Sequence, residues 1–134
     1  MSRIKRGEIY MARLQPTNGS VQAGTRPVLI IQNNMGNRYS PTTIVVPITT
    51  KKKNKSYLPT HVKVPKYMGL YENSVILCEQ IMTIDKGILG EKICKISRRK
   101  QIETNFALTV SILPGLVDML CQKYNFINPL KKRI

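Results

Sequence analysis

The hydrophobic pattern of the chain changes its period once, near Ser97, and this change limits the folds that the chain can adopt. Before Ser97 the apolar residues form short runs or alternate with polar ones, which is typical of β-strands. After Ser97, which is a good helix N-cap, an apolar stripe recurs at helical spacing. We therefore expect a mainly β protein with helices at its C-terminal end, and we expect the stripe to be core. The stripe consists of Ile102, Phe106, Val110 and Leu113.

Several segments have a strand pattern. The runs 27–32 and 42–49 are rich in β-branched residues, as in strands buried on both faces, and Pro47 indicates an edge or a bulge. The segment 15–25 is rich in Gly, Pro, Asn, Ser and Thr, and a loop of that length is commonly functional. These elements predict a strongly bent antiparallel sheet or small barrel with helices on one side. The predicted strands are 8–14, 27–32, 42–49, 60–64, 74–83 and 90–96, with a turn over 33–41, a basic loop over 51–55 and a second short helix over 116–124.

The length of 134 residues fits a single domain over 1–134, in which 125–134 is expected to be a mobile basic tail. The N-terminus is basic but lacks the apolar stretch of a signal peptide, and the most apolar segment, 108–120, is too short to span a bilayer. The three cysteines are odd in number and form no Cys-x-x-Cys pair, so we expect reduced thiols. These features predict a soluble cytoplasmic protein with no membrane contact.

The charge of the chain is strongly unbalanced. Lys and Arg number 22 against 7 Asp and Glu, which gives a formal net charge of +15. At that charge the folded state repels itself, and an anionic partner relieves the repulsion. Nucleic acid is the commonest such partner, and a membrane surface or an acidic protein segment are the alternatives.

Several kinds of catalytic chemistry lack the residues they need. The single histidine, His61, excludes an acid–base pair of two histidines within one chain. The seven acidic residues are scattered and predict no carboxylate cluster for metal ions, and no Gly-rich phosphate loop precedes a helix. We therefore expect no metal and no cofactor, and an enzyme of this sequence would have to use arginine, lysine and hydroxyl groups.

Arg26 and Thr49 are candidates for such chemistry because they lie at strand ends. Arg26 opens one buried strand and Thr49 closes the next, and strands adjacent in sequence often pair. A guanidinium with a hydroxyl suits RNA cleavage by the 2′-hydroxyl of the substrate, since the protein then needs only to position the RNA and stabilise charge. The alternative is an ion-paired surface arginine and a threonine that is simply a strand former.

Five segments resemble the successive motifs of the MazF/PemK toxins, the sequence-specific endoribonucleases of toxin–antitoxin pairs. They occur in the same order, nearly without gaps, between residues 4 and 120, and they are most similar to the MazF (EndoA) type of Gram-positive bacteria. The segments are 6–10 (Arg-Gly-Glu-Ile-Tyr), 24–33 (Gly-Thr-Arg-Pro-Val-Leu-Ile-Ile-Gln-Asn), 43–49 (Thr-Ile-Val-Val-Pro-Ile-Thr), 58–62 (Leu-Pro-Thr-His-Val) and 74–81 (Ser-Val-Ile-Leu-Cys-Glu-Gln-Ile).

The resemblance implies that Arg26 is the catalytic arginine and Thr49 the catalytic threonine. It implies an SH3-like barrel of the CcdB/MazF/PemK toxin fold, and a homodimer with an RNA groove at the interface. It also implies metal-independent cleavage of single-stranded RNA at short U- and A-containing words, leaving a 2′,3′-cyclic phosphate and a 5′-hydroxyl. The inhibitory partner implied is a MazE-like antitoxin, which binds through its acidic C-terminal segment and which a chain of charge +15 would attract.

The resemblance also points to residues that contact RNA. Val21 occupies a position that is acidic in many relatives, which leaves the base preference open. His61 can instead be a structural histidine that caps a strand, Gln80 can be a solvent-facing or bridging amide, and the lysines can be a solvated loop. The expected RNA-binding residues are Ser20, Gln22, Lys51, Lys52, Leu58, Pro59, His61, Glu79 and Gln80.

Two other functions remain open at this stage. A CcdB-like gyrase inhibitor has the same fold, but those proteins end in Trp-Gly-Ile, whereas this chain has no tryptophan and ends in Lys-Lys-Arg-Ile. A non-catalytic nucleic-acid-binding module is compatible with the charge, although Arg26 and Thr49 both lie within intact motifs.

Overall fold

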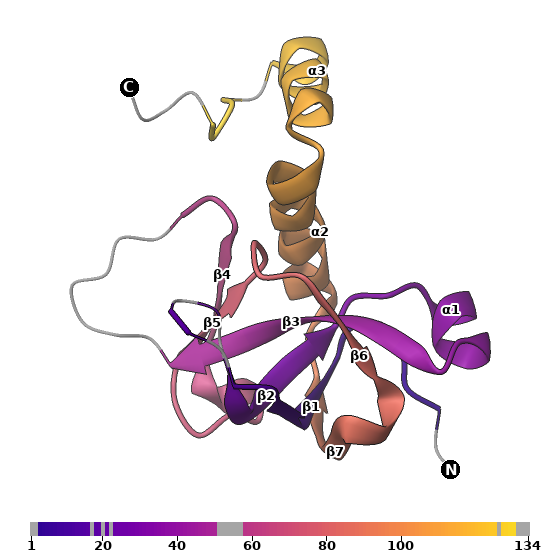
Figure 1. Ribbon diagram of the computed structural model, residues 1–134. Coiled ribbons are helices and arrows are strands. Elements are labelled where there is room, and N and C mark those ends of the chain that lie inside the picture. The colour runs from indigo at the N-terminus through magenta and orange to yellow at the C-terminus, as the bar shows by residue number, and fades with distance from the viewer. Residues whose placement is uncertain are drawn as a thin grey trace.

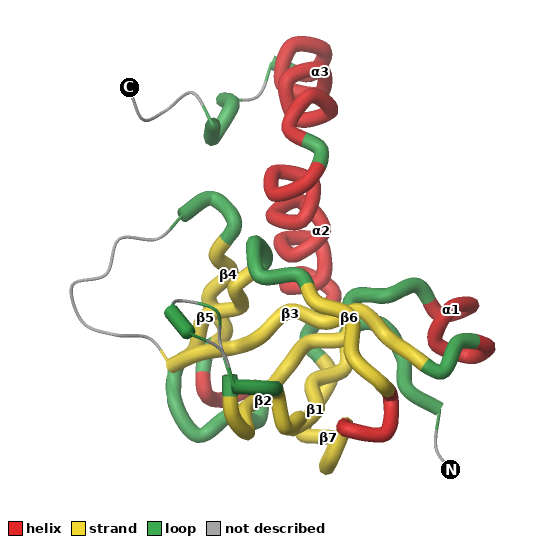
Figure 2. The backbone as a smooth tube through the Cα atoms, in the orientation of Figure 1, coloured by secondary structure: helices red, strands yellow, loops and turns green. Residues whose placement is uncertain are grey.

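The strands form one curved antiparallel sheet. The computed structural model describes residues 3–16, 18–19, 21, 23–50, 58–125 and 127–130. Within these residues seven strands are arranged in the order β4-β5-β3-β2-β1-β7, and β6 pairs with β3 beside this path (Figures 1 and 2). The mainly β class with C-terminal helices is confirmed. The strands are β1 (Glu8–Leu14), β2 (Gly24–Ile30), β3 (Thr42–Thr50), β4 (His61–Val64), β5 (Ser74–Leu77), β6 (Met82–Asp85) and β7 (Leu89–Lys95).

The helices are distributed unevenly around this sheet. Two α-helices follow the last strand, and α2 rises from the sheet while α3 lies beyond it, away from the strands (Figure 1). The α-helices are α1 (Asn34–Tyr39), α2 (Arg98–Ile112) and α3 (Pro114–Tyr124), and the 3-10 turns are η1 (Lys66–Met68) and η2 (Lys86–Ile88).

Alternate residues of the central strands face two separate cores. Leu29, Val46 and Ile76 belong to the cluster that also contains Ala107 and Leu108 of α2. On the opposite face a second cluster is formed by side chains of β1, β2, β3 and β6. Because successive strand residues point to opposite faces, this division fixes which face every other residue of these strands occupies.

The segment predicted as one long strand over 74–83 is broken in two. Ile48 of β3 pairs with Ile76 and Val45 pairs with Met82, so β3 advances by three residues while its partner advances by six. The three extra residues leave the ladder between β5 and β6, and we call residues 78–81 the bulge. Pro47 lies in β3 between the residues that pair with β5 and those that pair with β6. The bulge that Pro47 indicated is therefore in the neighbouring segment and not in β3 itself.

The segment 33–41, predicted as a turn, contains the helix α1. Its N-cap is Asn33, whose side chain accepts a 2.8 Å hydrogen bond from the backbone N–H of Gly36. The buried Asn37 ties the helix to the sheet, since its amide oxygen accepts from Thr43 at 2.7 Å and its amide nitrogen donates to the Gln32 carbonyl at 2.9 Å. A polar segment became helical here because its asparagines cap and anchor it.

Helix α2 begins at its expected cap, where the Ser97 hydroxyl accepts from the backbone N–H of Lys100 at 3.2 Å. The expectation that the apolar stripe is core is confirmed for Val110, which is 4% exposed and packs with Val117 and Cys121 of α3. It was wrong for the other three residues in the single chain, because Ile102, Phe106 and Leu113 are 58%, 42% and 54% exposed. The face that packs on the sheet instead contains Ala107 and Leu108.

The hinge between α2 and α3 is sharp. Pro114 starts the second helix at its first turn, and the two helices are bent by 119° relative to one another. No single helix of the described residues is long and apolar enough to cross a membrane, and only this bent pair reaches the length and composition of a span.

The buried acid Glu8 joins the first strand to the last. It is 5% exposed, accepts from the Lys5 N–H at 2.8 Å and the Tyr10 hydroxyl at 3.1 Å, and pairs with Lys92 of β7 at 2.6 Å. Burial by itself would raise the pKa of Glu8, but these donors outweigh it and the net pKa is lowered. Burial and the Glu8 carboxylate together raise the pKa of Tyr10 to about 12, so its hydroxyl stays protonated as a donor.

We expect Glu8→Gln to lower the free energy of unfolding by about 1–3 kcal/mol at pH 7, because the amide cannot replace a charge-assisted set of hydrogen bonds. A lowered carboxyl pKa stabilises the fold above the ordinary value of 4.5 and stops doing so as the pH falls through the folded-state value. In urea titrations, the difference in the free energy of unfolding between wild type and Glu8→Gln should therefore narrow as the pH falls below 4.5 toward the folded-state pKa. Glu103→Gln, at an exposed pair with Lys100, is the matched control and should change little; equal losses in both variants would contradict the prediction.

Candidate active site

Arg26 and Thr49 lie on neighbouring strands, each two residues beyond the last residue pair of the β2–β3 ladder. The β2–β3 ladder pairs Val28 with Pro47, and its register continued by two residues sets Arg26 against Thr49. Both residues alternate with core residues that face α2, so both side chains project from the face of the sheet opposite that helix. The sequence predicted that these residues sit at strand ends. In the structure both lie near the ends of β2 and β3, and the extended register puts their side chains in one row across the two strands.

The same row continues across the sheet to a lysine. Thr49 pairs with Val75 of β5, and Val75 pairs with Lys63 of β4. Directly opposed residues of antiparallel strands share a face, so the exposed Lys63 stands two strands from Thr49 on the same face as Arg26. This row therefore presents a guanidinium, a hydroxyl and an ammonium group together.

The two central side chains differ in how they are held. Arg26 is half-buried, and its Nε donates to the Ala23 carbonyl at 2.9 Å, which fixes the plane of the guanidinium. The Thr49 hydroxyl makes no hydrogen bond within the described part of the chain and is half-buried. The arrangement joins an oriented cation to a hydroxyl that can turn toward a ligand.

A turn at Leu58–His61 and the bulge lie side by side near this face. The turn is closed by the His61 N–H, which donates to the Leu58 carbonyl at 2.9 Å, and the bulge is attached to it by the Cys78 N–H, which donates to the Thr60 carbonyl at 3.0 Å. Thr60 Oγ1 donates to Glu79 Oε1 at 2.9 Å, and His61 Nε2 lies 3.1 Å from Glu79 Oε2. The turn and bulge are thus one hydrogen-bonded unit.

The predicted RNA-binding residues fall into two groups. Leu58, Pro59, His61, Glu79 and Gln80 all belong to this turn and bulge, so the structure brings them together. The expectation that Glu79 and Gln80 sit late in a strand was wrong, because both are in the bulge. The remaining predicted contacts, Ser20, Gln22, Lys51 and Lys52, lie outside the described residues.

Lys63 and Thr60 are candidates that the sequence analysis did not single out. One signal in the sequence could have pointed to Lys63. The alternation of 60–64 puts Lys63 on the same face as His61, and the motif before this segment, 43–49, ends at Thr49. What the sequence did not contain was the register that sets Lys63, Val75 and Thr49 in one row.

The acidic and thiol groups are dispersed in the described ranges. No group of three or more His, Cys, Asp or Glu there is close enough to hold a metal ion. Burial raises the pKa of the Cys78 thiol to about 12, and burial also raises the pKa of Cys94. Neither thiol is therefore activated as a nucleophile.

Comparisons with known proteins place the chain in a class. Residues 5–112 match the model of the PemK-like, MazF-like toxins of type II toxin–antitoxin systems. A MazF from Deinococcus radiodurans superposes with a TM-score of 0.71 at 22% identity, over 86% of this chain and 99% of that one. A mycobacterial endoribonuclease solved with its cognate antitoxin has a TM-score of 0.66 at 25% identity, over 81% of this chain and 94% of that one. The fold predicted from the resemblance is confirmed, and the class is that of the type II toxins.

Within that class the sequence relatives identify the family. The endoribonuclease MazF of Staphylococcus epidermidis is 51% identical over 110 residues, 81% of this chain and 91% of that protein. The MazF of Staphylococcus saprophyticus is 49% identical over the same shares. The chain belongs to the PemK/MazF family, and the helix α3 lies beyond the residues that match the family model.

Proposed function

We propose that this chain is the toxin of a type II toxin–antitoxin system and a metal-independent, sequence-specific endoribonuclease that cuts single-stranded RNA. The observation that carries the proposal is the row of Arg26, Thr49 and Lys63 on one face of the sheet. Family membership and the names of the staphylococcal relatives support the activity. The gyrase-inhibitor and non-catalytic alternatives gain no support from those names.

The proposed reaction is an internal transfer at phosphorus. The 2′-oxygen of the substrate attacks the adjacent phosphorus and loses its proton to water, the bond from phosphorus to the 5′-oxygen breaks, and that oxygen gains a proton from water. The products are a 2′,3′-cyclic phosphate and a 5′-hydroxyl. Because the nucleophile belongs to the RNA, the protein has to align three atoms and stabilise the charge on the phosphorane oxygens.

The two central side chains fit this task differently. A guanidinium stays protonated and matches two phosphate oxygens with its donor fork, so we assign stabilisation of the phosphorane charge to Arg26 and not the removal of a proton. The Thr49 hydroxyl can donate to a phosphate oxygen or accept from the 2′-hydroxyl. Lys63, two strands away, then contacts the phosphate of a flanking nucleotide.

The mechanism predicts cutting in the presence of EDTA and no cutting where the scissile nucleotide carries a 2′-deoxy sugar. End-mapping of an RNA oligonucleotide and its singly deoxy-substituted twin measures both. Cleavage that continues at the deoxy site would exclude the 2′-oxygen as nucleophile.

In the same assay Arg26→Ala and Thr49→Ala should each lower the rate by about 10²–10³, the usual cost of one preorganised stabilising group. The matched controls are the exposed neighbours Arg13→Ala and Thr50→Ala, which point to the other face of the sheet. They should retain wild-type rates; full activity of either active-site variant would move the site elsewhere.

Lys63→Gln should weaken RNA binding and reduce the log–log salt dependence of the affinity by about 0.7, the value for one phosphate contact to a single strand. Fluorescence anisotropy with a deoxy-substituted, uncleaved RNA across a salt series measures this. Lys95→Gln, at an exposed position of β7, is the control for simple loss of net charge. Equal slopes for the two variants would remove Lys63 from the groove.

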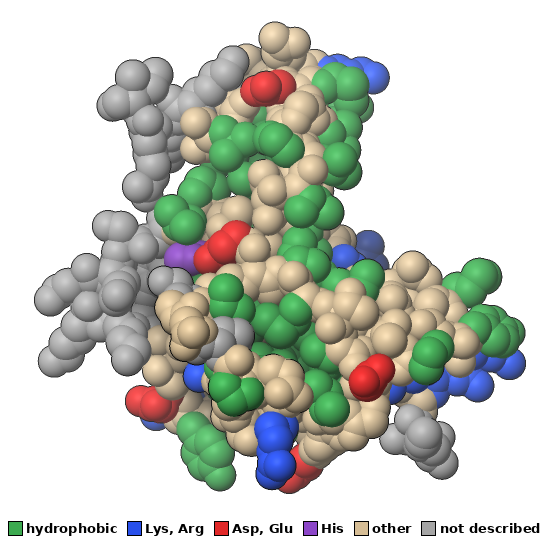
Figure 3. All heavy atoms as spheres, viewed as in Figure 1, with side chains coloured by type: hydrophobic (Ala, Val, Ile, Leu, Met, Phe, Trp, Pro, Cys, Tyr) green, Lys and Arg blue, Asp and Glu red, His purple; other side chains and the backbone are tan. Residues whose placement is uncertain are grey.

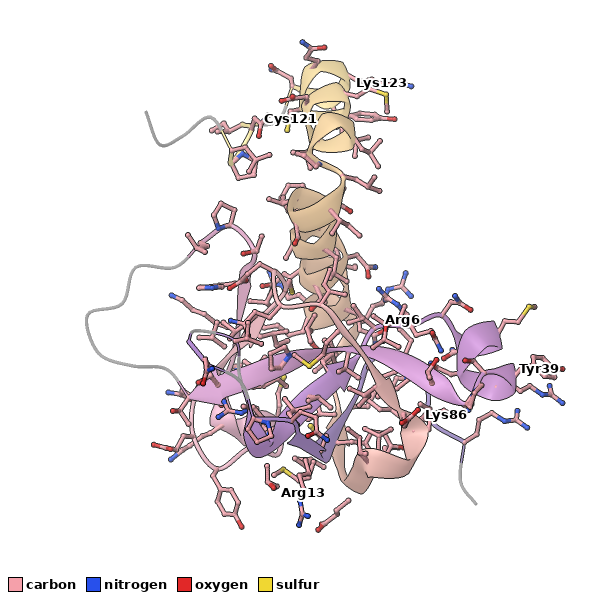
Figure 4. The ribbon with its side chains drawn as sticks, in the orientation of Figure 1. Arg6, Arg13, Tyr39, Lys86, Cys121 and Lys123 are labelled. Carbon is pink, nitrogen blue, oxygen red and sulfur yellow. The ribbon has the colours of Figure 1, made fainter. Side chains whose placement is uncertain are left out.

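We further propose that the working form is a homodimer. Three apolar side chains of the α2 stripe are exposed in the single chain, with Ile102, Phe106 and Leu113 at 58%, 42% and 54%, and neighbouring exposed apolar side chains commonly mark a protein interface. Beside this stripe lies a cavity of about 480 Å³ that is lined by residues of α2 and β3 and by Arg6. Figure 4 shows Arg6 near the base of α2. Figure 3 shows hydrophobic side chains running along α2 and α3. A second copy that covers α2 removes this surface from water.

The inhibitory partner proposed is the acidic C-terminal segment of a MazE-like antitoxin. The net charge of +15 favours an anionic segment, and the related mycobacterial endoribonuclease was solved with its antitoxin. Since the proposed substrate is cellular RNA, the cytoplasm is the compartment in which toxin and antitoxin would meet.

Native mass spectrometry tests both partners at once. The chain alone should appear at twice its 15.3 kDa, and an acidic antitoxin peptide should add to that mass and be lost as ionic strength rises. Phe106→Glu should give the single-chain mass, whereas Tyr71→Glu, at a fully exposed aromatic elsewhere, should not. A dimer that survives Phe106→Glu unchanged would exclude the α2 stripe as its interface.

A further inference from the structure

Three side chains join the turn to the bulge, and we call them the clasp: Thr60, His61 and Glu79. Each oxygen of the Glu79 carboxylate has its own partner, Thr60 Oγ1 at 2.9 Å for Oε1 and His61 Nε2 at 3.1 Å for Oε2. In Figure 3 the one histidine, in purple, lies against an acidic side chain, in red. Two hydrogen bonds on two oxygens fix both the position and the plane of the carboxylate.

The clasp also fixes the proton on His61. The backbone N–H of Leu58 donates to His61 Nδ1 at 3.2 Å, and a donor there requires a lone pair on Nδ1. The ring proton of a neutral imidazole must then be on Nε2, where it is donated to Glu79 Oε2. The arrangement therefore requires one protonation state and one tautomer, a neutral ring protonated at Nε2.

The carboxylate that the clasp orients still has a surface open to a ligand. Thr60 is 9% exposed and the His61 side chain 16%, whereas the Glu79 side chain is 32% exposed. An ionised carboxylate only accepts hydrogen bonds, and it repels phosphate. On a face that also carries Arg26 and Lys63, Glu79 is therefore suited to the N–H edge of a base and unsuited to the phosphate backbone.

The clasp lies too far from Thr49 to take part in bond breaking. His61 is two strands and two residues from Thr49 along the paired rows, and strand geometry makes that separation roughly 12 Å. A ligand group there belongs to a nucleotide that flanks the scissile phosphate. The bulge makes this possible because its residues have left the ladder and need not alternate with core residues.

We propose that the clasp sets the sequence preference of cutting, with Thr60 and neutral His61 as positioning residues that hold the Glu79 carboxylate against one flanking base. This inference rests on the proposed ribonuclease function. It assigns to His61 no proton transfer at all, although it is the only histidine of the chain.

The first experiment reads the tautomer directly. In untagged, ¹⁵N-labelled protein the single histidine gives one set of ring signals, so a long-range ¹H–¹⁵N spectrum at neutral pH reports its state without assignment work. We expect a neutral ring with the proton on Nε2. A ring protonated on Nδ1, or charged, would overturn the clasp. Glu79→Gln should leave the proton on Nε2, because the Leu58 N–H still requires the lone pair on Nδ1 and the amide oxygen can accept from Nε2.

The second experiment compares matched variants on a pool of RNA words that differ at one position each. Thr60→Val keeps the shape but loses the donor, while Thr60→Ser keeps the donor. Likewise His61→Asn can accept from Leu58 but not reach Glu79, while His61→Gln can donate to Glu79. The selectivity, measured as the ratio of kcat/KM between the preferred word and its substituted forms, should fall on the order of tenfold in Thr60→Val and His61→Asn. Thr60→Ser and His61→Gln should retain most of it.

The outcomes separate the two proposals. If the wild type cuts and Thr60→Val and His61→Asn, folded by circular dichroism, keep the wild-type word preference, the clasp role is wrong and the ribonuclease stands. If the wild type cuts no RNA while remaining folded, the proposed function fails and the selectivity role fails with it. Loss of kcat on the preferred word as deep as that of Arg26→Ala would also count against the clasp, because a positioning pair so distant should act on selection rather than on chemistry.

Discussion

The pairing of β3 along both of its edges is the constraint on which the rest of the molecule depends. On one edge it pairs with β2, and on the other it pairs first with β6 and then with β5. Every side chain of β3 therefore points to one of the two faces of the sheet. Val46 and Ile48 point to the core beneath α2, and Val45 and Thr49 point to the other face. A shift of register by one residue would bury Thr49 and expose Ile48, so the core that stabilises the sheet also aligns the candidate site.

The proposed base contact, Glu79, lies in the bulge, where the chain is not paired with β3. Three residues in excess between β5 and β6 free the bulge from the ladder, while β3 runs on without interruption. Of the backbone groups released there, the Cys78 N–H donates to the Thr60 carbonyl of the neighbouring turn, and the Gln80 N–H donates to the Leu77 carbonyl of β5. The rigid row of Arg26 and Thr49 and the freed bulge with Glu79 thus divide the proposed work between bond breaking and base selection. On this proposal, sequence preference can change through the turn and bulge without moving Arg26 or Thr49.

The sequence predicted elements well where burial and local propensity agree, and poorly where polar contacts or other chains decide. β1 was predicted at its observed bounds, and the Ser97 cap was found because its signal is local. The helix α1 was missed because Asn37 anchors it by bonds to residues outside the segment. The bulge was missed because Cys78 and Ile81 are apolar like the strands on either side, and nothing in the pattern shows that Glu79 and Gln80 between them leave the ladder. The pair Arg26 and Thr49 came from the motif resemblance, and its alignment required the β2–β3 register.

The exposure of three residues of the α2 stripe shows what helical periodicity in a sequence can and cannot predict. Periodicity shows that Ile102, Phe106 and Leu113 share an apolar face, but not whether their own chain or another one covers it. The cavity beside this face is also lined by Ile81, the last residue of the bulge. In the proposed homodimer a second chain that covers α2 closes this cavity and packs next to the bulge. Dimer formation would then support the position of Glu79, so that base selection requires the assembled pair, whereas the row of Arg26 and Thr49 is built within one chain.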